Sequence, residues 1–213
     1  MTPIYMHMQP DVAVAPGMSH FWGNPEVPHG FAFPSATDEY GEEWDLRFIC
    51  QINLADIAPW DKDNLLPHHG MLAVFADIDY YLGECDETSI MGFIGSPQHV
   101  KVAYFKDIES LHELCVIDSD NNPISPAPVA ISFDHTHPHL SDEHALFAHP
   151  SHRPWEYWDK PFDNWEILLQ IDSCQGPDFN LNFMDCGVLN ILISPKDLHN
   201  KRFDRVRPIV LST

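Results

Sequence analysis

The residues best suited to chemistry are the histidines and carboxylates crowded into residues 134–152. Neutral imidazoles and carboxylates are typical ligands of Zn²⁺ and similar divalent ions. In an extended segment, residues two apart point to the same side, so His135 and His137 could bind one ion, with His144 as a third ligand. This pattern leads to the hypothesis of a metal-dependent hydrolase. Because the spacing matches no established zinc signature, a His-rich surface loop is the alternative.

Other catalytic signatures are missing from the sequence. The chain has no G-x-S-x-G turn for a serine nucleophile, no phosphate-binding P-loop and no dinucleotide-binding glycine motif. Acidic residues such as Asp172 and Asp185 could supply paired carboxylates for acid–base catalysis, but sequence spacing does not show that any two approach each other. We therefore predict no catalytic residues and no cofactor, and favour a non-enzymatic role.

The charge of the chain favours a protein partner over nucleic acid. Its 213 residues include 32 Asp and Glu against 11 Lys and Arg, a formal net charge of −21 at pH 7. Nucleic-acid binding needs Lys and Arg at the phosphates, whereas an acidic surface attracts a basic protein or is simply solvated. The main hypothesis is a binding module that recognises a basic protein through an acidic, aromatic surface. An immunity-like protein that neutralises a basic toxin or nuclease is one version of it.

Aromatic and amide side chains are the candidates for that surface. Tryptophan suits half-buried positions and interfaces, and several tryptophans lie in proline-rich stretches. For each candidate, packing within the fold is the alternative, with buried amides satisfied by internal hydrogen bonds. The residues predicted to bind a partner or ligand are Trp22, Trp44, Gln51, Trp155, Trp158 and Gln170.

The sequence predicts neither secretion nor membrane insertion. The first 18 residues contain no Lys or Arg and no long apolar run, and no window approaches 18 consecutive apolar residues. The five cysteines are an odd number without CxxC spacing, which is typical of free thiols in a reducing compartment. We therefore expect a cytoplasmic protein that does not bind membranes.

A repeated pattern organises the chain. Residues 47–76 and 166–193 each run from apolar residues through a Gln-Ile pair and a polar connector to a Gly-apolar-Leu stretch. In the first copy, strict alternation predicts that Phe48, Cys50 and Ile52 share one face of a strand. Two strands joined by a loop and used twice predict a pseudo-symmetric β core.

The repeat carries one glutamine in each copy, Gln51 and Gln170, on the face opposite the alternating apolar residues. A buried amide must be hydrogen-bonded, so this pair would lock the register of each half. A small ligand bound between the repeats is the alternative.

Turn signals divide the chain into about eight short strands and a few short helices. They favour one mainly β (β-dominated α+β) domain, a roll-like fold of short antiparallel strands over residues 21–213, preceded by an extended arm at residues 1–20. Besides the repeat, strands are predicted at 100–105, 115–118, 128–134 and 208–212, and short helices after the capping residues Asn53, Asp107, Ser141 and Ser194.

Several motifs together resemble those of the YwqG-like proteins, a bacterial family without an assigned function. The resemblance covers residues 20–210 and implies a mainly β, roll-like fold, but transfers no catalytic residue. Residues 146–150 depart from the family pattern, and the His-rich run is particular to this chain. The matching motifs include Gly23-x-Pro25-x-x-Pro28-x-Gly30, Phe48-Ile49-Cys50-Gln51-Ile52, Leu168-Leu169-Gln170-Ile171-Asp172 and Phe203-Asp204-x-Val206.

Overall fold

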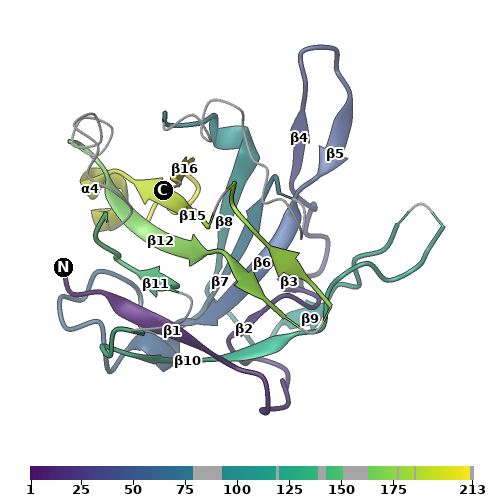
Figure 1. The fold of residues 1–213 in the computed structure, drawn as a ribbon. Coiled ribbons are helices and arrows are strands. Elements are labelled where there is room, and N and C mark those ends of the chain that lie inside the picture. The colour runs from purple at the N-terminus through teal and green to yellow at the C-terminus, as the bar shows by residue number, and fades with distance from the viewer. Residues whose placement is uncertain are drawn as a thin grey trace.

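The computed structural model describes residues 1–78, 93–118, 120–138, 143–150, 163–176, 178–184 and 186–211. Within them the chain forms one large antiparallel sheet that curls until it nearly closes (Figure 1), so the predicted mainly β class is confirmed. Its strands are β1 (Ile4–Gln9), β2 (His20–Phe21), β6 (Arg47–Asn53), β7 (Met71–Ala76), β8 (Val100–Phe105), β10 (Val129–Asp134), β11 (Ala145–Leu146), β12 (Glu166–Asp172), β15 (Val188–Ile193) and β16 (Val206–Leu211).

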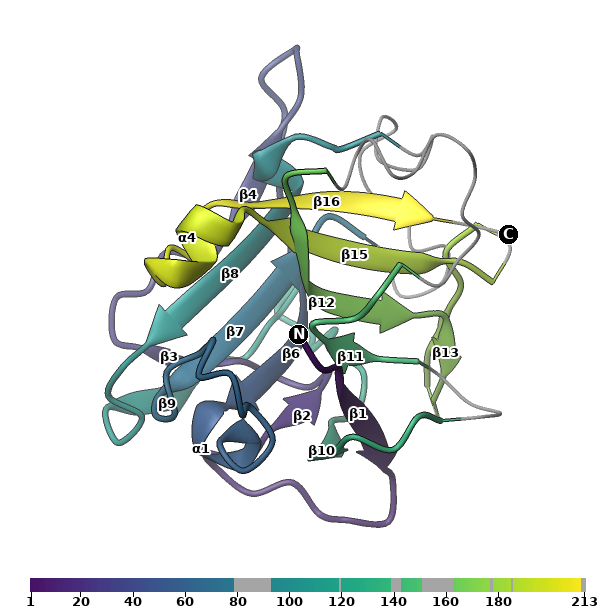
Figure 2. The ribbon, with the colours of Figure 1, turned by 90° about the vertical axis from the view of Figure 1, so that its left-hand side faces the viewer.

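Short ribbons and helical segments accompany the large sheet. The ribbons pair β3 (Glu26–Pro28) with β9 (Leu111–Glu113), β4 (Ser35–Thr37) with β5 (Glu43–Asp45), and β13 (Cys174–Gln175) with β14 (Asn180–Leu181). The helical segments are α1 (Leu54–Ile57), the 3-10 turn η1 (Pro97–His99) and α4 (Pro195–His199). Figure 2 shows the hairpin of β4 and β5 projecting beyond the body of the sheet.

The large sheet repeats itself about its middle. Its strand order is β16-β15-β12-β11-β1-β10-β2-β6-β7-β8. This order reads the same from both ends once β1 is matched with β10, β2 with β11, β6 with β12, β7 with β15 and β8 with β16. The pairs β6–β7 and β12–β15 are the two copies of the predicted repeat. The duplication is therefore confirmed, and it extends over all five strands of each half.

Hydrogen bonds next to the repeats follow the same symmetry. The backbone N–H of Trp22 donates to the carbonyl of Ile49 at 2.8 Å, and that of Phe147 donates to the carbonyl of Leu168 at 3.2 Å. Trp22 and Phe147 also share a positive φ, 54° and 55°, which bulky side chains rarely adopt. A residue with this strained backbone conformation thus follows β2 in one half and β11 in the other.

A β-bulge changes which residues of each repeat strand share a face, so the predicted faces need correction. The register shifts between Phe48 and Cys50 in β6 and at the equivalent place in β12. The extra residue turns Phe48 onto the outer face, where it packs with Phe75, while Ile49 joins Cys50 and Ile52 in the interior core. The prediction that Phe48 shares a face with Cys50 was wrong. A bulge interrupts the alternation of faces, but in a run of apolar residues it leaves no visible sign in the sequence.

The interior of the curled sheet is filled by apolar side chains from both halves. Leu72 and Val74 of β7 share this core with Leu189 and Ile191 of β15. Burial of such side chains from water contributes about 25 cal/mol per Å² of apolar surface. The core therefore joins the two halves into one body.

Two predicted helix caps are confirmed. The Asn53 side chain accepts a hydrogen bond from the backbone of Ala55 at the start of α1, and the Ser194 side chain accepts one from Asp197 at the start of α4. Both satisfy backbone N–H groups that a helix leaves free in its first turn.

The other two predicted helices are not found. Asp107 accepts the backbone N–H of Glu109 within a turn, and Leu111–Glu113 forms β9 because it pairs with β3. After Ser141, the described residues contain β11 instead of a helix. In both places pairing with a distant strand overrides the local capping signal.

Two strand predictions also change. Residues 115–118 form no strand, only an isolated bridge between Ile117 and Pro123. Residues 4–9 of the predicted arm are extended as expected, but they form β1, which lies inside the large sheet between β11 and β10.

Candidate functional site

Two of the histidines predicted as metal ligands follow β10, and their rings contact different neighbours. His135 Nδ1 donates to the carbonyl of Pro3 at 2.8 Å. His137 Nε2 lies 3.1 Å from Glu143 Oε1, and its ring meets Tyr5 edge-on. The two rings are therefore engaged by different parts of the chain.

The third histidine, His144, is almost completely buried beside Phe21, with 1% of its surface exposed. Its Nδ1 accepts the backbone N–H of Asp172 at 3.0 Å, so the neutral ring carries its hydrogen on Nε2. Burial lowers the pKa of His144 to about 3, which keeps the ring neutral near pH 7. Because His144 Nδ1 already accepts this backbone hydrogen bond, its lone pair is not free to bind a metal.

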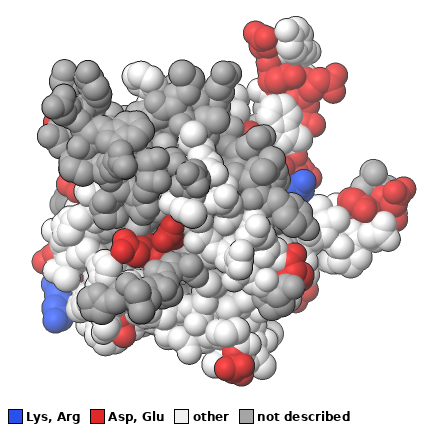
Figure 3. Space-filling model, viewed as in Figure 1, with Lys and Arg blue, Asp and Glu red and all other residues white. Residues whose placement is uncertain are grey.

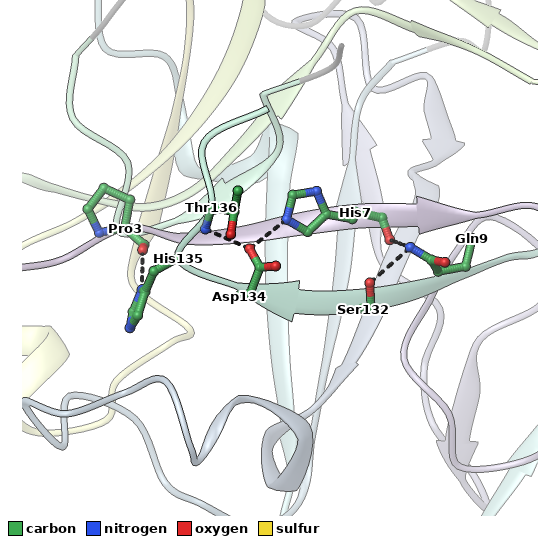
Figure 4. A network of polar contacts seen from close by, with 7 residues as sticks. All are labelled: Pro3, His7, Gln9, Ser132, Asp134, His135 and Thr136. Carbon is green, nitrogen blue, oxygen red and sulfur yellow. Dashed lines mark hydrogen bonds and ion pairs between the residues drawn. The ribbon is translucent and has the colours of Figure 1, made fainter. Parts of the chain in front are cut away.

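The acidic residue at the start of the His-rich run is also engaged. Figure 4 shows Asp134 Oδ1 between His7 Nε2 at 2.8 Å and the backbone N–H of Thr136 at 2.7 Å, while His135 turns toward Pro3. Among the described residues, no three His, Cys, Asp or Glu side chains are grouped to hold a metal ion. The structure therefore does not bring the three predicted histidines into a ligand set.

Gln51 is a fully buried hydrogen-bonding residue of the first half. Its Nε2 donates to the carbonyl of Met18 at 3.0 Å and to Glu26 Oε1 at 3.1 Å. Its Oε1 accepts the backbone N–H of Glu26 at 3.0 Å. The amide joins β6 to the chain before β2 and to β3, and does not face a partner.

Gln170 occupies the equivalent place in the second half. Its Nε2 donates to the carbonyl of Glu143 at 2.8 Å, which matches the bond from Gln51 to Met18. Its Oε1 is buried and has no partner among the described residues. Gln170 is also buried, so neither glutamine lies on a binding surface.

The predicted tryptophans differ in exposure. Trp22 is completely buried in the core. Trp44, on β5, is 38% exposed, and its Nε1–H donates to Asp77 Oδ1 at 2.7 Å. Trp155 and Trp158 lie outside the described residues. Of the predicted tryptophans that the structure describes, Trp44 alone reaches the surface.

The hairpin of β4 and β5 carries a group of exposed acidic side chains. Tyr40 at its tip is 83% exposed, and Trp44 lies on its second strand. Asp38 Oδ1 accepts the backbone N–H groups of Tyr40 at 2.9 Å and Glu42 at 2.8 Å, which shapes the tip. Figure 3 shows acidic side chains gathered on this hairpin. Its exposed carboxylates are Asp38, Glu39, Glu42, Glu43 and Asp45.

A cavity of about 510 Å³ lies where β2, β3 and β9 meet the chain before β10. Prolines form much of its apolar wall. Gly23 lies against one of them, and a Cβ built on Gly23 would be only 2.7 Å from Pro128 Cβ. Its φ of +74° also favours glycine, so this wall depends on the absence of a side chain. Its polar lining residues are His20, Asn24, Glu26, His112, Glu113 and Ser125.

His20 is a buried, neutral member of the cavity wall. Its Nδ1 is 2.7 Å from the carbonyl of Trp22. Because a carbonyl only accepts hydrogen bonds, Nδ1 carries the hydrogen and Nε2 keeps a free lone pair. Burial lowers the pKa of His20, with opposing contributions from hydrogen bonding and from Glu26 and Glu113.

The two glutamates give the cavity its negative charge. Glu26 Oε1 and Oε2 accept the backbone N–H of Gly17 at 2.8 and 3.0 Å. Glu113 Oε1 accepts Asn24 Nδ2 at 2.7 Å. The described lining residues include no Lys or Arg. The cavity is therefore rich in acceptors and lacks a cationic side chain to balance them.

Sequence reasoning did not find this cavity. The pairing of β3 with β9 brings His112 and Glu113 to the cavity that His20 of β2 also lines, and the predicted helix at 108–114 concealed that pairing. The sequence offers one signal, the Gly- and Pro-rich stretch at 23–34: its prolines fix φ and favour extended or turn backbone, but they do not show what this stretch faces.

The fold and site define a pseudo-symmetric antiparallel β protein with an acidic hairpin and an acceptor-lined cavity. Residues 19–210 match the family described as Domain of unknown function (DUF1963), and the chain belongs to that family. No curated protein matches the chain. No helix among the described residues has both the length and the apolar character needed to cross a membrane.

Proposed function

We propose that the chain is a binding module that recognises a basic protein through the β4–β5 hairpin. The observation that carries this proposal is the exposure, on one projecting hairpin, of five carboxylates together with Tyr40 and Trp44. Aromatic side chains supply contact area at protein interfaces, and carboxylates select and attract a basic surface.

The overall charge supports the same proposal. A formal net charge of −21 raises the rate at which a basic protein meets this chain, and the effect falls as salt screens the charges. An immunity-like role, in which the chain neutralises a basic toxin or nuclease, is the form of the proposal that the charge suits best.

Within its family we propose that the chain is one of the YwqG-like proteins. The motifs around Gly23 and in the two repeats support this assignment.

We also propose a cytoplasmic location. Cys50, Cys115 and Cys186 are free cysteines. Burial raises the pKa of the Cys50 thiol, so that side chain behaves as an unreactive core residue. Free thiols are typical of a reducing compartment.

A charge-matched capture experiment tests the proposal. The hairpin variant carries Asp38→Asn, Glu39→Gln, Glu42→Gln and Asp45→Asn, changes that keep the side-chain shapes and remove four charges. The wild-type chain, immobilised in low salt, should capture one identifiable basic protein from lysate of its own cells, and the hairpin variant should lose it. Raising the salt concentration should release the wild-type complex.

The control variant removes the same number of exposed charges elsewhere: Asp11→Asn, Asp63→Asn, Glu109→Gln and Asp120→Asn. It should retain the captured protein. Equal loss from both variants would show that net charge alone is responsible, and would overturn the assignment to the hairpin. Failure of the wild-type chain to capture any basic protein at low salt would overturn the proposed function.

A further inference from the structure

The cavity at β2, β3 and β9 is separate from the proposed protein-binding hairpin, because no residue of the hairpin (35–45) lines it. Its volume of about 510 Å³ falls within the range of small-molecule sites. Such sites combine apolar walls with a few convergent polar groups, and this cavity combines proline walls with His20, Glu26, His112 and Glu113.

The polar groups of the cavity favour a ligand that donates hydrogen bonds. The neutral His20 ring leaves Nε2 as an acceptor, because Nδ1 is held by the Trp22 carbonyl. The Glu113 carboxylate has lone pairs beyond the one used by Asn24. His112 Nδ1 is buried and has no hydrogen-bond partner among the described residues. A buried polar atom without a partner is uncommon and points to a missing one.

The charge of the cavity favours a cationic ligand. Glu26 and Glu113 are its charged residues, and the described wall holds no basic side chain to neutralise them. A bound cation would be attracted to both carboxylates. Its attraction to Glu26 would be stronger than in open solvent because Glu26 is half-buried, whereas Glu113 is exposed.

The cation that fits this geometry is organic. Among the described residues, no three His, Cys, Asp or Glu side chains are close enough together to coordinate a metal ion. The cavity is also far larger than a bare ion requires, and its prolines offer contact to an aliphatic stem. A guanidinium group has a planar fork of donors that matches a carboxylate and stacks on flat rings, and His112 presents such a ring, already stacked on His29 at 4.0 Å.

We propose that this cavity binds a small organic cation, a guanidinium group on a short aliphatic stem. Glu113 and His20 Nε2 accept its hydrogen bonds, Glu26 adds attraction by its charge, and the proline wall packs against the stem. The site belongs to the first half of the molecule alone, since its lining residues lie between Val14 and Pro128.

The test compares two ligands of nearly the same shape that differ in charge, butylguanidinium and butylurea. Titration calorimetry with the full chain should show saturable one-to-one binding of butylguanidinium and much weaker binding of butylurea. Glu113→Gln keeps an oxygen for Asn24 but removes the charge, and should weaken butylguanidinium binding about fivefold. Ala127→Trp, which places a large side chain on the exposed cavity wall, should abolish it.

Glu39→Gln is the matched control, because it removes one exposed charge from the hairpin, away from the cavity lining. It should leave the affinity for butylguanidinium unchanged. Equal weakening by Glu39→Gln and Glu113→Gln would reduce the effect to net charge and overturn the proposal. Butylurea binding as tightly as butylguanidinium, or no saturable binding of either compound, would also overturn it.

Discussion

The two halves of the sheet share a backbone plan, but their equivalent buried glutamines, Gln51 and Gln170, form different hydrogen bonds. Gln51 makes hydrogen bonds through both ends of its amide, to Met18 and to Glu26. Among the described residues, Gln170 makes only the bond equivalent to the one with Met18, from its Nε2 to the carbonyl of Glu143. Glu26 begins β3, so the extra bonds in the first half come from the ribbon that also forms the acceptor-lined cavity.

A second pair of equivalent positions shows the same divergence. Ser19 Oγ accepts the backbone N–H of Asn53 at 2.8 Å, and His144 Nδ1 accepts that of Asp172 at 3.0 Å. The backbone positions and the direction of the bond agree, whereas the side chains differ in size and in titration. The duplicated backbone therefore constrains where an acceptor is needed, but leaves its chemistry open to change in each half.

Replacing each glutamine with methionine tests the first contrast. Gln51→Met retains length but removes every hydrogen bond of a buried amide and leaves Met18 and Glu26 groups unpaired, so we expect a loss of about 3 kcal/mol of unfolding free energy. Gln170→Met removes one bond and should cost about 1 kcal/mol. Urea unfolding measures both. Equal losses would contradict the idea that the two amides differ in structural importance.

Acid should weaken the second half through His144. Its folded pKa of about 3 lies below the ordinary value of 6.5, so the unfolded chain takes up a proton first as the pH falls. The stability contributed by the neutral ring is full above pH 6.5 and is lost toward pH 3, with about 2.5 kcal/mol gone at pH 4.5. Urea unfolding at pH 7.5 and 4.5 measures the loss.

The variant His144→Asn isolates this effect, because asparagine retains an acceptor for Asp172 and does not titrate. The variant should lose less stability than the wild-type chain between the two pH values, by about the same 2.5 kcal/mol. Other groups, including the buried His20, contribute to both proteins and cancel in the difference. The same pH dependence in both proteins would refute the assignment to His144.

In the first half, Ser19→Ala should have a smaller effect that does not depend on His144. It removes the acceptor for Asn53 and the bond that Ser19 Oγ donates to Asp56 at 2.7 Å, and we expect a loss of about 1.5 kcal/mol. The matched control is Ser110→Ala at an exposed turn, which should change stability by less than about 0.5 kcal/mol. Similar values for the two serines would show that the bond to Asn53 contributes little.

The smallest effect is expected from the hairpin of β4 and β5, which lies outside the large sheet. Replacing residues 38–42 by Asn-Gly shortens the tip to a favoured two-residue turn and removes only exposed residues. Thermal and urea unfolding should change by less than about 0.5 kcal/mol. A loss of several kcal/mol would mean that the tip supports the fold rather than being free to bind.

The sequence by itself determined the β class, the duplicated strand pair and the caps at Asn53 and Ser194. Each of these is encoded locally: alternation reports a strand, a similar string of residues reports a copy, and a capping side chain bonds within its own first turn. It also indicated Trp44 as a surface aromatic, although it grouped Trp44 with the buried Trp22.

Only the tertiary structure decided the bulge at Phe48, the strand β9 and the partners of the histidines. Residues 108–114 carry a helical spacing, but β3 offers hydrogen bonds to an extended backbone at residues 111–113 and so determines the outcome. The cavity depends on that same pairing, which joins residues about 85 positions apart. Local patterns report which residues avoid water, whereas the identity of a distant partner depends on how the whole sheet closes.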